Sequence, residues 1–317
     1  MKGTARLPKA ARDVRRGDRR ALARLITAVE NGDRSAEPTL RALYPFTGRA
    51  HVIGITGPLG VGKSSVINEL IAHLRGLGRT VAVLAVDPSS PFSGGSVLGD
   101  RIRLDRAPED SGVFIRSMAS RGHAGGVAIA TRASVRLLEA AGFEIVLVET
   151  VGSGQVDVEI RDVATTSVVV LVPHLGDEVQ TMKAGLFEIA DVFCVNKSDL
   201  PGAERAEKHL TDLAGTGRPR DGWTARIVAT STSPPRGIDW LWEAIAAHEA
   251  FLDAGGRRSE EERRRLAKEI AGRVRDRVGE RILEDPALRG LVDRVLARTL
   301  DPETAARKLY AERFPSR

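Results

Sequence analysis

The sequence holds a single cysteine, Cys194, among its 317 residues. One thiol cannot form an intrachain disulfide or a zinc site built on cysteine clusters, so both of those protein classes are excluded. A chain without disulfides is typical of a reducing compartment. The sequence also lacks an apolar run near the ~18 residues that a membrane helix needs, and its first residues lack the apolar core of a secretory signal. We therefore expect a cytoplasmic protein with no membrane partner.

Aromatic residues are scarce, at 4%, but 42% of the residues are hydrophobic and 28% are charged, which is a globular composition. The length suits one large domain, or one core domain with extensions. Lys and Arg number 48 against 42 Asp and Glu, a net charge of +6. Because the basic side chains are interspersed with acidic ones rather than clustered, we expect no nucleic-acid partner.

Residues 49–252 alternate short apolar runs with longer amphipathic stretches. The runs are rich in Val and Ile without polar alternation, which is typical of strands buried on both faces. This alternation predicts right-handed crossovers and an α/β fold with a doubly wound, mainly parallel sheet. The expected strands are 51–56, 81–86, 113–116, 145–149, 168–172, 192–195 and 227–229, and the expected helices include 63–76, 125–141, 178–189 and 238–249.

Helical segments are expected on either side of this core. Residues 1–48 show apolar residues at helical spacing and predict an N-terminal helical extension, broken at 31–33. In residues 253–317, an apolar residue recurs every fourth position from Leu266 to Ile282, with Arg and Glu between. That pattern predicts a long helix with one narrow apolar stripe, followed by two shorter helices.

The first specific motif is a glycine-rich loop. The expected strand 51–56 runs into GPLGVGKS at 57–64, which matches G-x(4)-G-K-[S/T]. The glycines let several backbone N–H groups converge on a phosphate, and the following helix adds its positive end. Lys63 is expected to reach the β and γ phosphates, and Ser64 to ligate Mg²⁺. The nucleotide-binding residues expected in this segment are Gly60, Val61, Gly62, Lys63, Ser64 and Ser65.

A second motif, NKSD at 196–199, follows the sixth expected strand. The carboxylate of Asp199 can accept hydrogen bonds from the N1–H and 2-amino groups of guanine. Adenine offers neither donor, so ATP would leave a buried carboxylate unpaired. We expect the Lys197 stem to pack along the base and Asn196 to tie this loop to the phosphate loop. Three hydroxyl residues after the last strand, Thr230, Ser231 and Thr232, are expected near the base or sugar.

Three acidic residues are candidate ligands for Mg²⁺. Asp87 and Glu149 lie at the ends of expected strands, and Asp100 ends a glycine-rich loop. Mg²⁺ prefers hard oxygen ligands and keeps several waters, so one or two of these acids would bind it directly beside Ser64 and the others through water.

The segment ETVGSGQ at 149–155 suggests a γ-phosphate sensor. Gly152 would offer its backbone N–H to the γ-phosphate. Gln155 either positions the attacking water or is only a polar residue of the switch. The catalytic candidates are therefore Lys63, Glu149 and Gln155.

Five segments occur in a fixed order: GPLGVGKSS, VDPSSPFSGGSVLGDR, SRGHAGGVA, ETVGSGQ and VNKSD. Together they resemble the MeaB/ArgK-like GTPases, the family of the methylmalonic aciduria type A protein, within the SIMIBI class of P-loop proteins. The resemblance covers about residues 10–310. The second and fourth segments make it far more specific than the two nucleotide motifs alone.

The resemblance implies a homodimeric GTPase that uses GTP/GDP and Mg²⁺. It also implies a chaperone for an adenosylcobalamin-dependent acyl-CoA mutase, such as methylmalonyl-CoA mutase. The chaperone would gate loading of intact cofactor and help eject damaged cofactor. The loop 116–126 would then be a switch that senses the mutase, and the C-terminal helices a dimerisation arm. The exposed apolar stripe at 266–282 also favours a partner surface.

Departures from the family pattern fall mostly in the switch segment. Ser153 replaces a small apolar residue, 156–158 replace a common Ser-Glu pair, and Ser198 replaces Ala in the base motif. These changes leave the partner mutase open. Three alternatives remain: a nickel-insertion GTPase, an ATPase or kinase serving amino-acid transport, and a nucleotide-gated scaffold with negligible turnover. Because no arginine finger is evident in the chain itself, we expect slow intrinsic hydrolysis.

Overall fold

The structure is a computed structural model that describes residues 7–88, 110–120, 126–150, 160–173, 184–216 and 222–315. The chain forms two compact units, residues 1–257 and 258–317. Among the described helices, none has the length and apolar character to cross a membrane.

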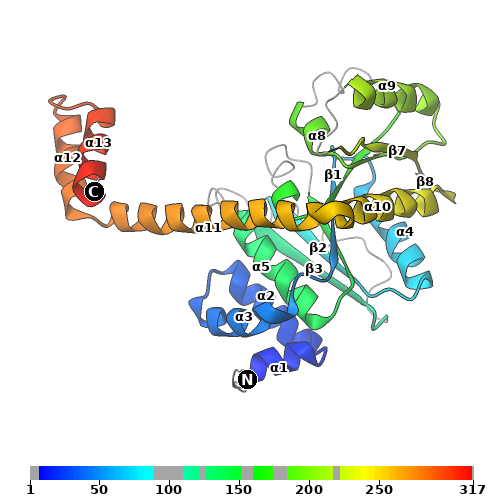
Figure 1. Ribbon diagram of the computed structural model, residues 1–317, viewed down its shortest axis with the longest axis horizontal. Coiled ribbons are helices and arrows are strands. Elements are labelled where there is room, and N and C mark those ends of the chain that lie inside the picture. Colours follow the sequence, from blue (N-terminus) through cyan, green and yellow to red (C-terminus); the bar gives the residue numbers. More distant parts are fainter. Residues whose placement is uncertain are drawn as a thin grey trace. The chain divides into compact units, whose positions relative to one another are not determined.

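A seven-stranded parallel sheet forms the centre of the first unit (Figure 1). Its strand order is β3-β2-β4-β1-β5-β6-β7, and every pairing is parallel. From β1 the chain runs outward to β2 and β3, then returns through β4 to β5, β6 and β7, so the expected doubly wound α/β fold is confirmed. The strands are β1 (His51–Thr56), β2 (Val81–Pro88), β3 (Val113–Ser120), β4 (Ile145–Thr150), β5 (Thr166–Leu171), β6 (Val192–Val195) and β7 (Arg226–Ala229).

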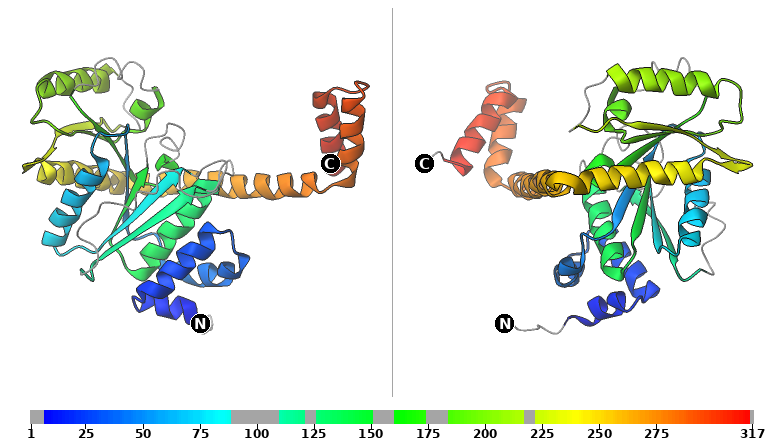
Figure 2. Two further views of the ribbon diagram at one scale, coloured as in Figure 1. Left: turned by 180° about the vertical axis from the view of Figure 1, so that it is seen from behind. Right: turned by 45° about the vertical axis from the view of Figure 1, so that its right-hand side comes forward.

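Helices cover the sheet (Figure 2). On one face, α4 (Lys63–Gly76) and α10 (Ile238–Asp253) pack against each other. The connection through α4 runs from β1 toward the β3 edge of the sheet, whereas the connections through α5 (Gly126–Ala141) and α9 (Ala203–Thr216) run toward the β7 edge. Because connections between parallel strands are right-handed, α5 and α9 lie on the opposite face from α4. The remaining short elements are η3 (Ile160–Asp162), α8 (Ala184–Ile189) and the hairpin of β8 (Ser231–Thr232) and β9 (Pro235–Arg236). Residues 178–183 of the helix expected at 178–189 lie outside the described residues.

The N-terminal helices belong to the first unit, where α2 (Arg19–Glu30) packs on α5. The sequence predicts one break in this zone, at 31–33, but the chain also turns at Gly17, whose φ is +82°. The side chain of Asp18 then caps the next helix by accepting the N–H groups of Arg20 and Ala21. The elements are α1 (Lys9–Arg15), α2 (Arg19–Glu30), η1 (Arg34–Ala36), α3 (Glu37–Leu43) and η2 (Tyr44–Phe46).

Arg116 is predicted to end a strand, 113–116, and to begin a switch loop, but the strand continues beyond it to Ser120. Arg116 lies within β3, an edge strand of the sheet. Its guanidinium donates a 2.8 Å hydrogen bond to Oγ1 of Thr27 and lies 3.7 Å from Oε2 of Glu30. Both partners belong to α2, so this cation fastens the N-terminal helices to the sheet edge. Residues 121–125 of the expected switch lie outside the described residues.

The second unit is helical, as the sequence predicts. An η4 turn (Ala254–Gly256) precedes α11 (Arg257–Leu283), which is followed by α12 (Pro286–Leu296) and α13 (Pro302–Arg313). The side chains of Asp285 and Asp301 cap the two shorter helices by accepting the N–H groups of Ala287 and Thr304.

Candidate nucleotide site

The phosphate loop connects β1 to α4, at the carboxyl edge of the sheet where ligands bind in open α/β folds. Gly62, the last loop residue before α4, has φ of +91°, a left-handed conformation that side chains rarely adopt. A Cβ at this position would also lie 2.5 Å from Nδ2 of Asn196. The glycine is therefore needed both for the backbone turn and for the close approach of the base motif.

Lys63 begins α4 with its side chain buried. Its ammonium group donates hydrogen bonds of 2.8 Å to the carbonyl of Gly57 and 2.9 Å to that of Pro58. The charge is thus held at the loop, at the N-terminal end of the helix, where anions are favoured.

Ser64 and Glu149 come together beside this loop. The Ser64 hydroxyl donates a 2.8 Å hydrogen bond to Oε1 of Glu149. Glu149 is buried in β4 and lies opposite Ile55 of β1. Two hard oxygen donors therefore converge at the loop, and this donor chemistry fits Mg²⁺, which takes few protein ligands and completes its shell with phosphate and water oxygens.

The base motif follows β6 and contacts the phosphate loop. Asn196 is buried, and its Nδ2 donates a 2.9 Å hydrogen bond to the carbonyl of Val61. Lys197 has φ of +56°, a strained value for a residue with a side chain, and its ammonium group donates to the carbonyl of Gly60 at 2.9 Å. Strained residues of this kind concentrate at ligand sites.

The loop after β7 orients the base motif. Oγ of Ser231 donates a 2.9 Å hydrogen bond to Oδ1 of the exposed Asp199, and Oγ1 of Thr230 donates to Oδ1 of Asn196 at 3.3 Å. Thr230 and Ser231 are buried, and Thr232 is half-buried. The sequence predicts Thr230, Ser231 and Thr232 near the base or sugar. Among the described residues, the hydroxyls of Thr230 and Ser231 instead contact side chains of the base motif.

The structure describes the other predicted site residues only in part. Ser65 is exposed on α4. The backbone of Asp87 lies in β2, two positions beyond Ala85, which pairs with Glu149, and its side chain lies outside the described part of the structure. Asp100, Gly152 and Gln155 also lie outside the described residues.

Cys194 lies behind the site in β6. Burial raises the pKa of its thiol to about 12. The group therefore stays protonated at neutral pH and is not a nucleophile.

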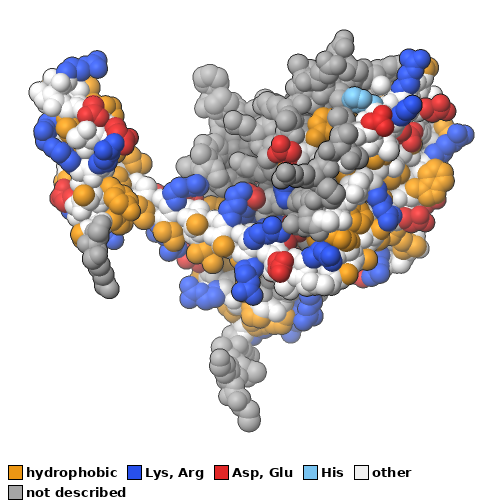
Figure 3. Space-filling view, turned by 45° about the horizontal axis from the view of Figure 1, so that its top comes forward, with side chains coloured by type: hydrophobic (Ala, Val, Ile, Leu, Met, Phe, Trp, Pro, Cys, Tyr) orange, Lys and Arg blue, Asp and Glu red, His pale blue; other side chains and the backbone are white. Residues whose placement is uncertain are grey.

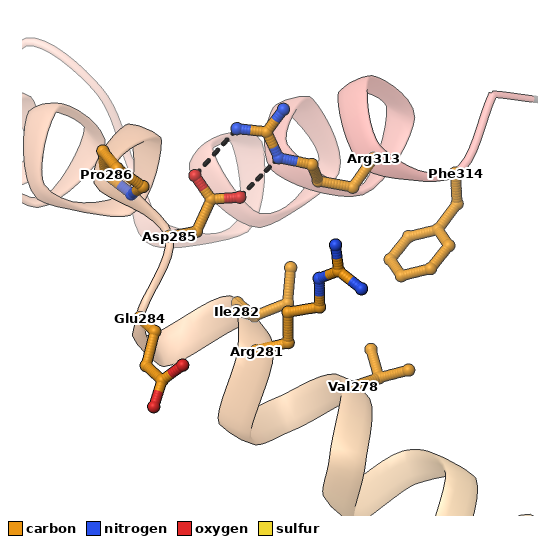
Figure 4. Close-up of a pocket in the computed structure, with 8 residues that line it drawn as sticks. All are labelled: Val278, Arg281, Ile282, Glu284, Asp285, Pro286, Arg313 and Phe314. Carbon is orange, nitrogen blue, oxygen red and sulfur yellow. Dashed lines mark hydrogen bonds and ion pairs between the residues drawn. The ribbon is translucent and has the colours of Figure 1, made fainter.

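The second unit carries an apolar groove of about 850 Å³ between its three helices. Figure 3 shows hydrophobic side chains gathered on this unit. Leu296 is 73% exposed, Tyr310 67% and Val292 45%. A neighbouring pocket is lined in part by Arg313, whose guanidinium binds the carboxylate of Asp285 through two hydrogen bonds (Figure 4).

Comparison with known proteins extends these observations. The family model described as "Methylmalonyl Co-A mutase-associated GTPase MeaB" matches residues 22–287. The chain is 46% identical over 300 residues to a protein of Pyrococcus horikoshii whose name gives GTPase only as a provisional activity, covering 92% of this chain and 94% of that protein. It is 36% identical over 265 residues to "GTPase ArgK" of Escherichia coli, covering 81% of this chain and 80% of ArgK.

A mammalian relative and a solved structure agree with this assignment. The mouse "Methylmalonic aciduria type A homolog, mitochondrial" is 30% identical over 327 residues, covering 95% of this chain and 78% of the mouse protein. A crystal structure of a protein called "LAO/AO transport system kinase" matches with a TM-score of 0.75 and 28% identity, covering 98% of both chains. Together with the phosphate loop and the base motif, these matches show that the chain belongs to the MeaB/ArgK family of P-loop GTPases.

Proposed function

We propose that this GTPase is a chaperone for an adenosylcobalamin-dependent acyl-CoA mutase, methylmalonyl-CoA mutase or a relative. It gates loading of intact cofactor and helps eject damaged cofactor. The observation that carries the proposal is the match of a mutase-associated GTPase family to residues 22–287, a range that includes the phosphate loop and the base motif. The name of the mouse relative, which refers to methylmalonic aciduria, supports the same partner.

In this proposal the phosphate loop and Lys63 hold the β and γ phosphates. Ser64 and Glu149 hold Mg²⁺, with Asp87 and Asp100 acting directly or through water. The 2.8 Å contact between the Ser64 hydroxyl and the Glu149 carboxylate supports this assignment, because it already brings two hard oxygens together. When bound, Mg²⁺ would neutralise charge on the phosphates.

Hydrolysis in this proposal uses residues beyond β4. The backbone N–H of Gly152 binds the γ-phosphate, and Gln155 orients the attacking water. Glu149 is the next-to-last residue of β4 and the first residue of the ETVGSGQ segment. A switch that starts beside the metal and the γ-phosphate can respond to loss of that phosphate.

Guanine recognition rests on Asp199. Its carboxylate accepts the N1–H and 2-amino groups of the base, while Ser231 holds it through a 2.9 Å hydrogen bond. Asn196 joins this loop to the phosphate loop through Val61, so the base and phosphate subsites are set at a fixed spacing. Lys197 covers the base plane, and Thr232 completes the loop at the base or sugar.

We also propose that the protein is a homodimer, with residues 1–48 as a helical extension, 49–252 as the GTPase domain and 253–317 as the dimerisation arm. The exposed apolar side chains of the groove support a second copy as its occupant, because monomers rarely expose contiguous apolar patches. Leu296→Asp should convert the dimer to a monomer in sedimentation analysis, and Lys308→Glu, an exposed charge change on α13, should not. A wild-type protein that sediments as a monomer would contradict this proposal.

The chaperone proposal is tested by cofactor transfer. Adenosylcobalamin is mixed with apo-mutase and this protein in the presence of GTP or a non-hydrolysable analogue, and transfer is followed by the cobalamin absorbance. Hydrolysis-dependent loading is expected, with the analogue blocking it. Loading that proceeds at the same rate with GTP, with the analogue and without this protein would contradict the proposal.

One observation favours a second candidate, a kinase or ATPase serving amino-acid transport, because the crystal structure with a TM-score of 0.75 carries a transport-kinase name. Competition between GTP and ATP separates the two. The proposed role of the Asp199 carboxylate, which can accept both donors of guanine and finds neither in adenine, predicts that ATP fails to displace bound GDP.

A further inference from the structure

Two threonine hydroxyls meet beside the phosphate loop. Oγ1 of Thr150 donates a 2.8 Å hydrogen bond to Oγ1 of Thr56, although the two residues are 94 positions apart. Thr56 ends β1, Thr150 ends β4, and both residues are buried. The register of the two strands pairs Ile55 with Glu149, so the hydroxyls join the next position along each strand.

The threonine contact closes a ring of three hydrogen bonds. Lys63 and Ser64, the first two residues of α4, supply the other two bonds. Nζ of Lys63 donates at 2.8 Å to the carbonyl of Gly57, which directly follows the threonine of β1. Oγ of Ser64 donates at 2.8 Å to Oε1 of Glu149, which directly precedes the threonine of β4. The ring therefore connects the end of β1, the start of α4 and the end of β4.

Two of the three ring bonds use groups that a bound nucleotide and its metal ion would claim. In the proposed function, Lys63 binds the phosphates, and Ser64 and Glu149 hold Mg²⁺. Each of these groups would then turn from its ring partner toward the ligand. The two threonine hydroxyls have no such role and lie in the protein interior, so their bond can persist whether the site is empty or filled.

The chemistry of this pair suits a stiff tie. A hydrogen bond in the protein interior is electrostatically stronger than one in water. Threonine is branched at Cβ, which restricts rotation about χ1. A shift of either strand end would therefore move its hydroxyl and strain the bond, instead of being absorbed by a flexible side chain.

We propose that Thr56 and Thr150 are positioning residues for GTP hydrolysis, which rests on the proposed roles of Glu149 and the ETVGSGQ segment. Their hydroxyl bond holds the end of β4 at a fixed distance from the phosphate loop, with and without ligand. Thr150 is the second residue of that segment. Because a displacement of about 1 Å can cost up to about 100-fold in rate, a segment that contacts the γ-phosphate needs a fixed starting point.

Hydrolysis and nucleotide binding by the full chain, measured without a mutase, test this role. Thr150→Val keeps the side-chain shape and removes the hydroxyl, so kcat for GTP should fall about tenfold or more while GDP affinity stays unchanged. Thr150→Ser keeps the hydroxyl and should restore hydrolysis. Thr39→Val, a change at a buried threonine of α3, is the control. A wild-type kcat in Thr150→Val would overturn the proposal.

The same test can be made from the other strand. Thr56→Val removes the acceptor and should lower kcat as Thr150→Val does, so the test survives if one variant does not fold. The double variant should lose no more activity than either single variant, because one shared bond is removed only once. Losses that multiply in the double variant would show that the hydroxyls act separately and would overturn the proposal.

A double-mutant cycle on stability tests whether the tie is independent of ligand. Urea unfolding of the four proteins should give a coupling of roughly 2- to 10-fold in the unfolding constant, the same with and without Mg²⁺ and GDP. A matched cycle of Ser64→Ala and Glu149→Gln should instead give a coupling that changes when Mg²⁺ and GDP are added. A threonine coupling that disappears with the ligand would contradict the proposal.

Failure of this inference and failure of the proposed function look different. If the wild type hydrolyses GTP and Thr150→Val does so at the same rate, only the positioning role is refuted. If Glu149→Gln leaves the Mg²⁺ dependence of GTP binding unchanged, the proposed metal site is refuted, and with it the basis of the positioning role.

Discussion

The hydroxyl of Ser64 donates a 2.8 Å hydrogen bond to Oε1 of Glu149, although the two residues are 85 positions apart. They meet because β1 and β4 are neighbours in the sheet, with Ile55 opposite Glu149. The contact links the first turn of α4 to the strand that leads into the ETVGSGQ segment. A metal ion held by these two oxygens would therefore couple the phosphate loop to that segment.

Replacing Ser64 by Ala should weaken Mg²⁺-dependent GTP binding roughly 10- to 100-fold, the range found when groups around a metal are removed. The variant should fold, because Ser64 is only half-buried. Titration of GTP at several Mg²⁺ concentrations measures the effect, and Ser35→Ala, which removes an exposed hydroxyl from η1, is the control. Unchanged Mg²⁺ dependence in Ser64→Ala would exclude Ser64 as a ligand.

Gly62 and Gly60 form a matched pair for the phosphate loop. Both have positive φ, +91° and +79°, but a Cβ on Gly62 would lie 2.5 Å from Nδ2 of Asn196, whereas one on Gly60 meets open space. Gly60→Ala should cost only the backbone strain, about 1–2 kcal/mol. Gly62→Ala should cost the same backbone strain, and it should also displace Asn196 and lower nucleotide affinity. Unfolding and GDP-binding curves for both variants test this, and equal losses would refute the steric argument.

Asp199→Ala should remove two hydrogen bonds to a charged acceptor, each worth about 1.5–3 kcal/mol. GTP affinity should fall at least about 100-fold, since every 1.4 kcal/mol is tenfold. ATP affinity should change little, so discrimination between the nucleotides collapses. Ser231→Ala only frees the Asp199 carboxylate to rotate, so it should lower GTP affinity roughly tenfold. Fluorescent-GDP displacement by each nucleotide measures both effects, and retained GTP preference in Asp199→Ala would contradict the base assignment.

Acid should destabilise the second unit by protonating the carboxylate of Asp285. The Arg313 guanidinium and the backbone N–H of Ala287 hold the pKa of the Asp285 carboxyl below its ordinary value. A depressed pKa means that the pair stabilises the fold above about pH 4 and is lost as pH falls through the folded-state pKa. Asp285→Asn should be less stable than wild type at neutral pH, and the two should converge in acid. Urea melts from pH 7 to 3 test this, and a constant difference across that range would disprove it.

Local motifs made parts of the fold predictable. The phosphate-loop pattern fixed the start of α4, and the helix spans 63–76 as expected. Continuous Val- and Ile-rich runs placed β1 and β6 at their observed bounds, because strands buried on both faces carry little else. The recurring apolar residues of 266–282 predicted a long helix followed by two shorter ones, which are α11, α12 and α13.

The contact of Asn196 with the phosphate loop was predictable from the two motifs, but several other contacts between distant segments were not. Spacing shows that Thr230 follows a strand, but the register of β6 and β7 decides that its hydroxyl meets Asn196. The sequence places Arg116 between an expected strand and an expected switch loop, and nothing in it indicates that α2 supplies the partners of this side chain. His51 and His248 look scattered in sequence, and only the sheet order brings them to one threonine.

The central claim is that this GTPase serves a mutase. Its most direct test is the rate of GTP hydrolysis with Mg²⁺, measured for the protein alone and with methylmalonyl-CoA mutase from the same organism. The account predicts slow hydrolysis alone, clear stimulation by the mutase, and loss of both activities in Lys63→Ala. A rate that the mutase leaves unchanged would contradict the assignment of this partner.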